Sequence, residues 1–452
     1  MNNMDYKTLS NKIFEKGKSQ INEMEVFIEK NKEFELEVFQ GEVDKYSISE
    51  SGGLSLRGLS NGKMGYSYTE KIDESSIDML VDEAYENGKH IDSLDKEVIS
   101  SGSDKYKTIE EQSELLKKIS TEDKIDFLKL LEKEALSLDE RVDSVQVVAY
   151  KEVEQERYIM NTKGVDLSDK FTGAMSYISV IVKDGDEIKT GMSYRVFNDF
   201  SKVDYNEMAK EAVEEGISML GATTIKSSSY PVIIKNHVFA SILSAFISVL
   251  SADNVQKGFS LLKDKIGTKI ASEILSIVDD PFLENGFASR SFDDEGTATE
   301  VRKIIDNGVL KTYFHNIKTA EKDNLESTGH GNRFSYKGSI SISPSNLYVD
   351  KGNNTFEGLV ESIDKGLLII DVAGLHSGLN PVSGDFSLSA SGYRIENGNI
   401  DKPVDLITIA GNLYELLKDI EGIADDLRFG FPGKSYIGSP SVKIKLLAIA
   451  GE

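Results

Sequence analysis

The sequence has no cysteine, and it has only five histidines and seven prolines among 452 residues. Without cysteine there is no disulfide bond, no cysteine nucleophile and no thiolate ligand for a metal, and such a composition fits a reducing compartment. The histidines are scattered, and no two stand four residues apart as the ligands of a helical zinc-protease motif do. Any metal site would have to gather its ligands from distant parts of the chain.

Positive charge and long apolar stretches are also scarce. The formal charge is −24 at pH 7, which argues against binding to a phosphate backbone because that affinity depends on Lys and Arg. The longest apolar stretch, Val238–Leu250, falls well short of the about 20 residues that a membrane span needs. The N-terminal stretch MNNMDYKTLSNKIFEKG contains no apolar core of a secretory signal. We therefore expect a cytoplasmic protein that binds neither nucleic acid nor membrane.

The N-terminal half contains two similar segments, Leu36–Ile91 and Gln155–Leu220. Each alternates apolar and polar residues through about three strands and then changes to the spacing of a helix. A tight-turn pair joins two strands in each segment, Asn61-Gly62 in the first and Asp184-Gly185 in the second. "GYSYTEK" matches "GMSYRVF", and "DEAYENG" matches "KEAVEEG". These matches predict a duplicated unit of three strands followed by a helix.

The C-terminal half has a different pattern. It follows a small, polar linker, "GATTIKSSSY", and a helix is expected over Asn236–Val255. Most of the rest alternates as hairpins, with turns at Asn307-Gly308 and Asn397-Gly398. We therefore expect an α+β protein with an N-terminal α/β unit at 1-110, its repeat at 111-222 and an antiparallel, β-rich C-terminal domain at 223-452.

Two polar motifs in the C-terminal half invite a chemical interpretation. "RSFDDEGTAT" (Arg290–Thr299) has three adjacent acids, the residue type that binds cations. Adjacent carboxylates on a strand point to opposite faces, so a solvated turn is the favoured interpretation. "STGHGNRFSY" (Ser327–Tyr336) is a Gly-rich loop with His330 and Arg333, and a backbone role is favoured over chemistry.

A third stretch, "GLHSGLNPVSGDFSLSASGYRIENG" (Gly374–Gly398), combines serine, histidine and aspartate. These are the residue types of a catalytic triad, but its serines alternate along a strand and no strand-to-helix elbow presents one as a nucleophile. The alternation places Phe386, Leu388 and Ala390 on one face and serines on the other. We interpret the stretch as a cradle that lines a cavity, in which an exposed edge strand holds an extended peptide by main-chain hydrogen bonds.

An ordinary core strand behind a structural loop is the alternative interpretation of this stretch. No catalytic residue and no metal ligand is assigned to it. The residues expected to bind substrate are His376, Asn380, Ser383, Gly384, Asp385, Ser387 and Ser389.

Several motifs resemble, in sequence and in order, those of the TldD/PmbA family. They are "PVIIKNHVF", "SIVDDP", "DDEGTATE", "IIDNGVLKTYFHN", "STGHGNR", "GLNPVSGDFSLSASGYRIENGNIDKPV" and "ITIAGNL". The similarity extends over nearly the whole chain and is closest to the PmbA (TldE) branch. It implies an N-terminal α/β portion, a β-rich C-terminal domain and a cytoplasmic metallopeptidase that processes or degrades peptides and unfolded proteins. It also implies a heterodimer of one TldD and one TldE subunit.

The chain departs from the TldD branch of this family at the zinc ligands. That branch carries HExxxH on the helix after its "PVV" strand, and here the aligned residues, Ser244–Val249, read SAFISV. The third ligand in that branch is a cysteine in a "GxCGK" context, and here "GFPGK" places Pro432 at that position. Side chains of these types neither bind zinc nor lower the pKa of its water. This agrees with the PmbA branch, in which the metal motif is absent.

The resemblance therefore implies a subunit with no cofactor of its own, which handles peptides beside a TldD-like partner that carries the zinc. A self-paired dimer is the other assembly left open. The alternative function is a stand-alone, non-catalytic binding or regulatory protein, such as a homodimeric modulator, and the family's older description as gyrase modulators belongs to this class.

Overall fold

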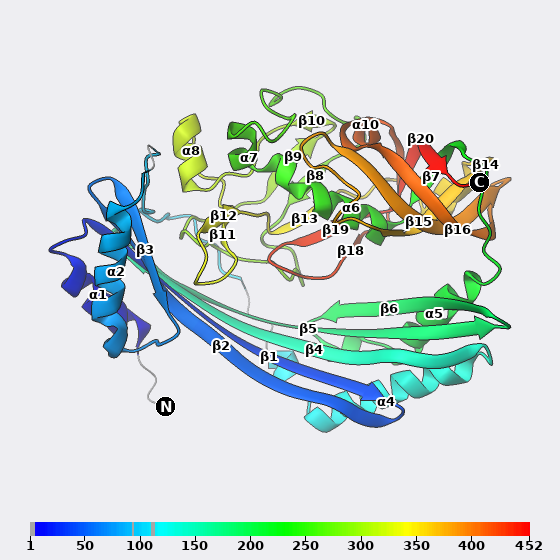
Figure 1. Cartoon of the computed structure of the whole chain (residues 1–452), viewed down its shortest axis with the longest axis horizontal. Helices are drawn as coiled ribbons and strands as arrows, with labels where there is room; N and C mark the ends of the chain where they lie inside the picture. The colour runs from blue at the N-terminus through cyan, green and yellow to red at the C-terminus, as the bar shows by residue number, and fades with distance from the viewer. Residues whose placement is uncertain (1–4, 93–94, 110–113) are drawn as a thin grey trace.

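The chain folds into a long, curved antiparallel sheet and a C-terminal domain that lies over one face of it (Figure 1). The structure is a computed structural model, and it describes residues 5–92, 95–109 and 114–452. The expected boundary between the first two units, at residues 110 and 111, lies outside the described residues. The predicted α+β, β-rich fold is confirmed. Among the described helices, none is both long and apolar enough to cross a membrane.

The curved sheet is built from two copies of one unit, as the sequence predicts. The first copy contains α1 (Tyr6–Gly17), β1 (Glu23–Phe39), β2 (Glu42–Ser60), β3 (Lys63–Thr69), the short η1 (Glu74–Ser76) and α2 (Ile77–Lys89). The second contains α4 (Thr121–Leu138), β4 (Val142–Asn161), β5 (Asp166–Asp184), β6 (Glu187–Phe197), η2 (Phe200–Lys202) and α5 (Tyr205–Ser218), and the one-turn α3 (Glu114–Lys117) precedes it. The strand order is β3-β2-β1-β4-β5-β6. The two copies therefore form one sheet, joined where β1 pairs with β4.

Matched glycines set the close packing of helix on strand in both copies. A Cβ atom on Gly65 would lie 1.7 Å from the carbonyl oxygen of Ala84, and one on Gly191 would lie 2.0 Å from that of Ala212. These residues belong to the two pairs of matched motifs. The matched motifs therefore correspond to the same contact in both copies, in which α2 lies against β3 and α5 lies against β6.

The C-terminal domain contains two six-stranded sheets and a small hairpin. One sheet has the order β16 (Asn399–Asn412), β15 (Asp385–Glu396), β14 (Lys365–Ala373), β7 (Ser228–Ile234), β20 (Val442–Ala450) and β17 (Ile420–Ile423), and an additional pairing of β16 with β20 closes five of these strands into a ring. The other has the order β10 (Val309–Leu310), β9 (Arg302–Asp306), β8 (Ile277–Asp279), β13 (Asn346–Val349), β19 (Tyr436–Ser439) and β18 (Arg428–Phe429). The hairpin pairs β11 (Gly331–Arg333) with β12 (Ile340–Ile342).

Most strand pairs of this domain are antiparallel, as expected, and β7–β14 and β13–β19 are parallel. The expected helix over Asn236–Val255 is present in three pieces, α6 (Asn236–Phe246), η3 (Ile247–Leu250) and α7 (Ala252–Gln256). The remaining helices are α8 (Ile317–Asp323), α9 (Phe356–Glu361) and α10 (Leu413–Lys418). The main hydrophobic core lies between α6 and the strands of the ring.

The two faces of the curved sheet differ in chemistry. Val26 and Ile28 of β1 and Leu56 of β2 are fully buried and belong to the core that includes α1 and α2. Their neighbours along the strands point the other way because side chains alternate across a strand. On that face Glu25 is 0% exposed and Arg57 is 7% exposed. The sheet therefore meets the C-terminal domain through buried charges.

These charges form a junction cluster, which we define as Glu25, Arg57, Arg157, Asp293, Asp294, Glu295 and Arg333. Its C-terminal members come from the two polar motifs noted in the sequence. The expectation of a solvated turn for the first motif is wrong, because Asp293, Asp294 and Glu295 are 0%, 2% and 2% exposed. The cause is a long-range contact, since Asp294 meets Arg157 and Glu295 meets Arg57, and both arginines lie on the N-terminal sheet.

Arginines from both halves of the chain connect the cluster. Arg57 donates to Glu25 through Nε at 2.9 Å and Nη2 at 3.0 Å. Arg333 donates to the same carboxylate through Nη2 at 2.5 Å and to Asp294 through its backbone N–H at 2.7 Å. Arg157 donates to Asp294 through Nη1 at 2.7 Å and also binds Asp169. The Gly-rich loop with Arg333 thus fastens the C-terminal domain to the sheet.

Asp293 and Glu295 shape the turn between these contacts. Asp293 accepts the backbone N–H groups of Glu295, Thr297 and Gly331 at 2.8–2.9 Å. Glu295 accepts the N–H of Ile317 at 2.8 Å and lies 3.5 Å from Nη1 of Arg57. Burial raises the pKa of Asp293 to about 6 and that of Glu295 to about 7, against the effect of the donors around them.

The raised pKa values predict a pH dependence of stability. An acid whose pKa is higher in the folded state than in the unfolded state binds more protons when folded. Its contribution to the free energy of unfolding is therefore largest at low pH and is lost as the pH rises through the folded pKa. For Glu295 this window runs from the unfolded pKa of 4.5 to the folded pKa of about 7. Relative to wild type, Glu295→Gln should gain on the order of 1 kcal/mol or more in free energy of unfolding between pH 4.5 and pH 8.

Chemical denaturation at a series of pH values measures this difference. Glu326→Gln, at an exposed position in the same domain, is the control and should follow the wild-type curve. A Glu295→Gln curve that runs parallel to wild type would contradict the prediction.

The glycine contacts predict a second effect on stability. Gly65→Ala and Gly191→Ala should each lower the free energy of unfolding by about 1–3 kcal/mol, because the added methyl group overlaps a helix carbonyl. Gly338→Ala is the control, since its Cβ would lie 3.5 Å from the nearest heavy atom. Equal unfolding midpoints for all three variants would contradict the prediction, because they would show that α2 and α5 can shift away from the added methyl groups at no cost in stability.

Candidate functional site

The structure confirms one part of the prediction for Gly374–Gly398, the alternation of its two faces, and contradicts another, its position at a sheet edge. Along β15, Phe386, Leu388 and Ala390 are buried, whereas Ser387 and Ser389 are exposed, so the two faces are those predicted. The prediction of an edge strand is wrong. β15 pairs with β14 on one side and with β16 on the other. Its main-chain groups are therefore used within the ring of strands and are not free to pair with a peptide.

Most side chains of the loop before β15 support the loop itself. Oδ1 of Asn380 accepts the N–H groups of Val382 and Ser383 at 2.9 and 3.3 Å. Gly384 has a φ angle of +83°, a conformation that favours glycine. Nδ2 of Asn412 donates to Asp385 at 2.8 Å, and this bond and one with Ser383 lower the pKa of Asp385.

His376 differs from its neighbours in this loop. It is exposed and has no hydrogen-bond or ion-pair partner within the described ranges. The seven predicted residues lie on this loop and the first half of β15; His376, Asn380, Asp385, Ser387 and Ser389 are exposed, Ser383 is half-buried and Gly384 is buried. Their role in substrate binding stays a prediction.

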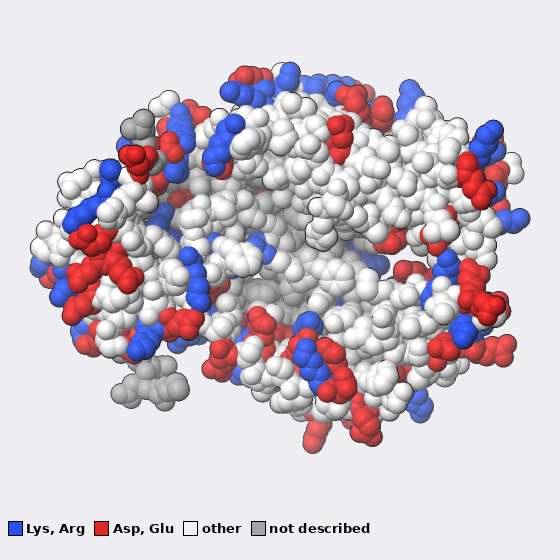
Figure 2. All heavy atoms as spheres, in the orientation of Figure 1, with Lys and Arg blue, Asp and Glu red and all other residues white. Residues whose placement is uncertain are grey.

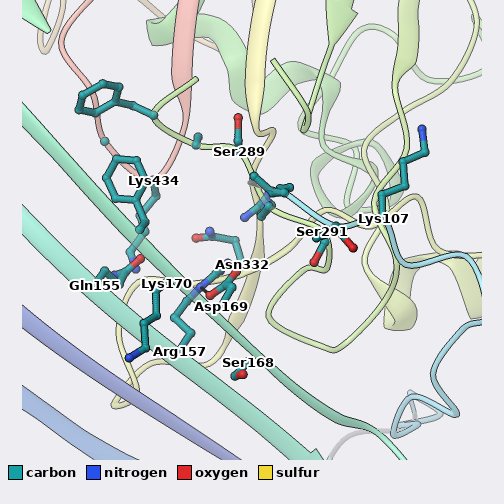
Figure 3. A pocket seen from close by; sticks show the side chains of 17 residues that line it. Lys107, Gln155, Arg157, Ser168, Asp169, Lys170, Ser289, Ser291, Asn332 and Lys434 are labelled. Atoms are coloured by element: carbon teal, nitrogen blue, oxygen red, sulfur yellow. Dashed lines mark hydrogen bonds and ion pairs between the residues drawn. The ribbon is translucent and has the colours of Figure 1, made fainter. Parts of the chain in front are cut away.

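A cavity of about 500 Å³ lies elsewhere, between the curved sheet and the C-terminal domain. β4 and β5 supply one wall, and the segment Phe287–Ser291, Asn332 and Lys434 supply the other (Figure 3). Residues Lys107–Ile109 close one side. The molecular surface is hollowed between the sheet and the C-terminal domain (Figure 2). None of the seven predicted residues lines this cavity.

The walls of the cavity are basic, in contrast to the chain as a whole. Among the described residues, the charged side chains that line it are those of Lys107, Arg157, Lys170, Arg290, Lys434 and one acid, Asp169. Three of these cations are paired: Arg157 with Asp169 and Asp294, Lys434 with Glu29 at 3.1 Å, and Lys170 with Glu156 at 3.5 Å. The ammonium group of Lys107 lies over the ring of Phe282 at 4.5 Å.

Polar and aromatic side chains complete the lining. Gln155, Asn332, Ser168, Ser289 and Ser291 offer hydrogen-bonding groups. The rings of Phe171 and Phe287 meet edge to face, with centroids 5.3 Å apart. Ligand sites typically combine such apolar walls with a few polar groups, in volumes of roughly 300–1,000 Å³.

Sequence reasoning missed this cavity because its parts come from distant segments. "RSFDDEGTAT" supplies Arg290 and Ser291, "STGHGNRFSY" supplies Asn332, and "GFPGKS" supplies Lys434. Each motif has too few features alone to indicate a site. The only signal available was that three Gly- and polar-rich motifs occur in one half of the chain.

The residues at the metal-ligand positions implied by the resemblance do not fit zinc. At the two histidine positions, Ser244 on α6 is exposed, and Val249 on η3 is 4% exposed and packs in the main core. The side chain of Pro432 has no donor atom for a metal. Within the described part of the chain, no group of three or more His, Asp or Glu side chains is placed to hold a metal ion.

Three family models match the chain in order. They are domain 1 of the PmbA/TldA metallopeptidases over residues 24–88, the central domain over 114–220 and the C-terminal domain over 227–451. Among curated proteins, a "Metalloprotease TldD homolog" of Buchnera aphidicola is 29% identical over 88% of this chain and 86% of its own length. A "Metalloprotease PmbA homolog" of Haemophilus influenzae is 30% identical over 71% of this chain and 68% of its own length.

Solved structures agree with these matches. A protein of Thermotoga maritima, named as a candidate modulator of DNA gyrase, is 32% identical with a TM-score of 0.90, over 99% of this chain and all of that one. TldE from Thermococcus kodakarensis shares the fold with a TM-score of 0.90 at 23% identity, over 98% of this chain and all of that one. The chain belongs to the PmbA/TldD metallopeptidase family.

Proposed function

We propose that this chain is the PmbA/TldE-type, non-catalytic subunit of a two-subunit metalloprotease. In this proposal the cavity between the sheet and the C-terminal domain holds peptide, and a TldD-like partner supplies zinc and the catalytic groups. The observation that carries the proposal is that the chain has a polar cavity but has no zinc-binding side chains at the positions aligned with the TldD ligands. Gly433 and Lys434, next to Pro432 in "GFPGK", line the cavity, so the loop expected to hold a metal ligand in a TldD chain borders the cavity here.

The lining suits a peptide better than a cofactor. Amide and hydroxyl side chains can pair with peptide groups, while Phe171 and Phe287 give apolar contact without a shape-specific slot. The absence of cysteine fits the reducing cytoplasm, where we place the complex. We further propose a dimer, with a TldD-like chain or with a second copy, in which the C-terminal domain makes the main contact.

A second candidate function is a stand-alone regulatory protein. The name of the Thermotoga relative, a candidate modulator of DNA gyrase, favours this class. The formal charge of −24 makes direct binding to DNA an unfavourable basis for such a role.

Co-expression separates the two candidate functions. The purified chain alone should hold no stoichiometric zinc and cleave no peptide, because the positions of the two histidines, the glutamate and the cysteine carry Ser244, Val249, Ala245 and Pro432. With a TldD-type chain of the same organism it should form a complex that contains zinc and cleaves peptides in a chelator-sensitive way. Metal analysis, light scattering and a peptide-cleavage assay check this.

The control for this experiment is a partner whose HExxxH glutamate is changed to glutamine, which should keep the complex and lose cleavage. Chelator-sensitive cleavage by this chain alone, or a strict monomer in the presence of the partner, would contradict the proposed function.

One bulky substitution at each of two serines compares the two candidate peptide surfaces. Ser168→Trp adds a ring on β5 in the cavity, and Ser389→Trp adds one on the exposed face of β15. Both serines are exposed, so both variants should fold. Ser168→Trp should slow cleavage by the complex because it narrows the cavity. If the loop and β15 bind peptide as predicted, Ser389→Trp should slow cleavage as well.

Initial cleavage rates at subsaturating peptide measure both effects. A wild-type rate with Ser389→Trp would remove the seven loop and strand residues from peptide binding. A wild-type rate with Ser168→Trp would place the peptide outside the cavity.

A further inference from the structure

One arginine of the cavity wall has unused hydrogen-bonding capacity. Arg290 is 4% exposed and lines the cavity. Its Nη2 donates to the carbonyl oxygen of Ser343 at 3.0 Å. Its Nε is buried without a hydrogen-bond partner. A guanidinium has five N–H donors, and a buried donor without a partner is unfavourable. Arg290 thus retains donors for a ligand that enters the cavity.

The acids nearest to Arg290 are already occupied. Asp293 accepts three backbone N–H groups, and Asp294 accepts from Arg157 and from the backbone of Arg333. Against the effect of burial, the positive charge of Arg290 acts to lower the pKa of both acids from a distance. Among the described residues, Arg290 forms no ion pair with either of them. In the same wall, Asn332 is 4% exposed, and its side-chain amide has no hydrogen-bond partner in the described ranges. Figure 3 shows Asn332 projecting into the cavity beside Arg157 and Asp169.

We propose that Arg290 and Asn332 bind a carboxylate group of the peptide held in the cavity, an inference that rests on the proposed function. The planar fork of a guanidinium matches a carboxylate in a bidentate arrangement. Arg290 has no acidic ion-pair partner among the described residues and suits a single negative charge, whereas the dianion of a phosphate would lie close to Asp169 and Asp294. The carboxylate is either the C-terminus of the peptide or an acidic side chain.

Labelled peptides of one neutral sequence test this with the purified full-length chain. One form has a free C-terminus, one is amidated, and one is amidated with an internal aspartate. Fluorescence anisotropy should show that at least one carboxylate form binds about tenfold or more tightly than the neutral amide. Preference for the first form identifies the C-terminus, and preference for the third identifies a side chain.

Variants distinguish bidentate binding by the Arg290 guanidinium from nonspecific attraction by the positive charges of the cavity lining. Arg290→Gln should abolish the preference, and Arg290→Lys should leave a reduced one because it keeps the charge but loses the fork. Lys107→Gln is the matched control. It removes the same charge from the lining, but the ammonium group of Lys107 lies over Phe282 and points away from the labelled polar groups. Lys107→Gln should therefore keep the wild-type preference.

Several outcomes would overturn the inference. They are equal binding of the three peptides, binding of none, an equal loss of preference with Lys107→Gln, or competition by inorganic phosphate as strong as that by the carboxylate peptide. The wild-type peptide series decides the question even if Arg290→Gln does not fold. The proposed function is tested separately, by cleavage in the complex, and it survives if peptides bind without regard to their carboxylates.

Discussion

The buried ion pairs between the curved sheet and the C-terminal domain are the constraint on which the rest of the structure depends. Removing charges from water is costly, and the cost is offset only when each charge meets a well-placed partner. Here the partners come from different halves of the chain, as Arg57 and Glu25 do with Glu295 and Arg333. Any displacement of one half would leave buried charges unpaired. The cluster therefore fixes the distance between the two walls of the cavity.

Arg157 connects this cluster with the cavity itself. Its guanidinium binds Asp294 in the cluster and Asp169 at the cavity surface. Beside it, burial would raise the pKa of Asp294, but the charges of Arg157 and Arg290 lower it. The same acid thus remains ionised and orients the guanidinium that lines the cavity. Stability of the junction and electrostatics of the candidate site depend on the same residues.

Local patterns in the sequence predict the parts of this fold whose causes are local. The Asn61-Gly62 turn, the alternation from Phe386 to Ser389 and the repeated Gly and Ala positions all follow from neighbours in the chain. The edge position of β15 and the solvated turn at Asp293 were wrong for a shared reason. Both depend on which distant segment lies alongside, β14 and β16 in one case and β1, β2 and β4 in the other. The cavity lay beyond prediction because six separate segments form it.

The ring of five strands has a consequence for the order in which the protein folds during synthesis. All six strands of the curved sheet have left the ribosome soon after residue 197, and most of their pairs join neighbours in the chain. By contrast, β7 at Ser228–Ile234 must wait for β14 and then for β20 at Val442–Ala450. Pairing of such distant strands is slow, and domains made first fold first. The charged face of the sheet stays open to water until Asp294, Glu295 and Arg333 have been made and pack against it.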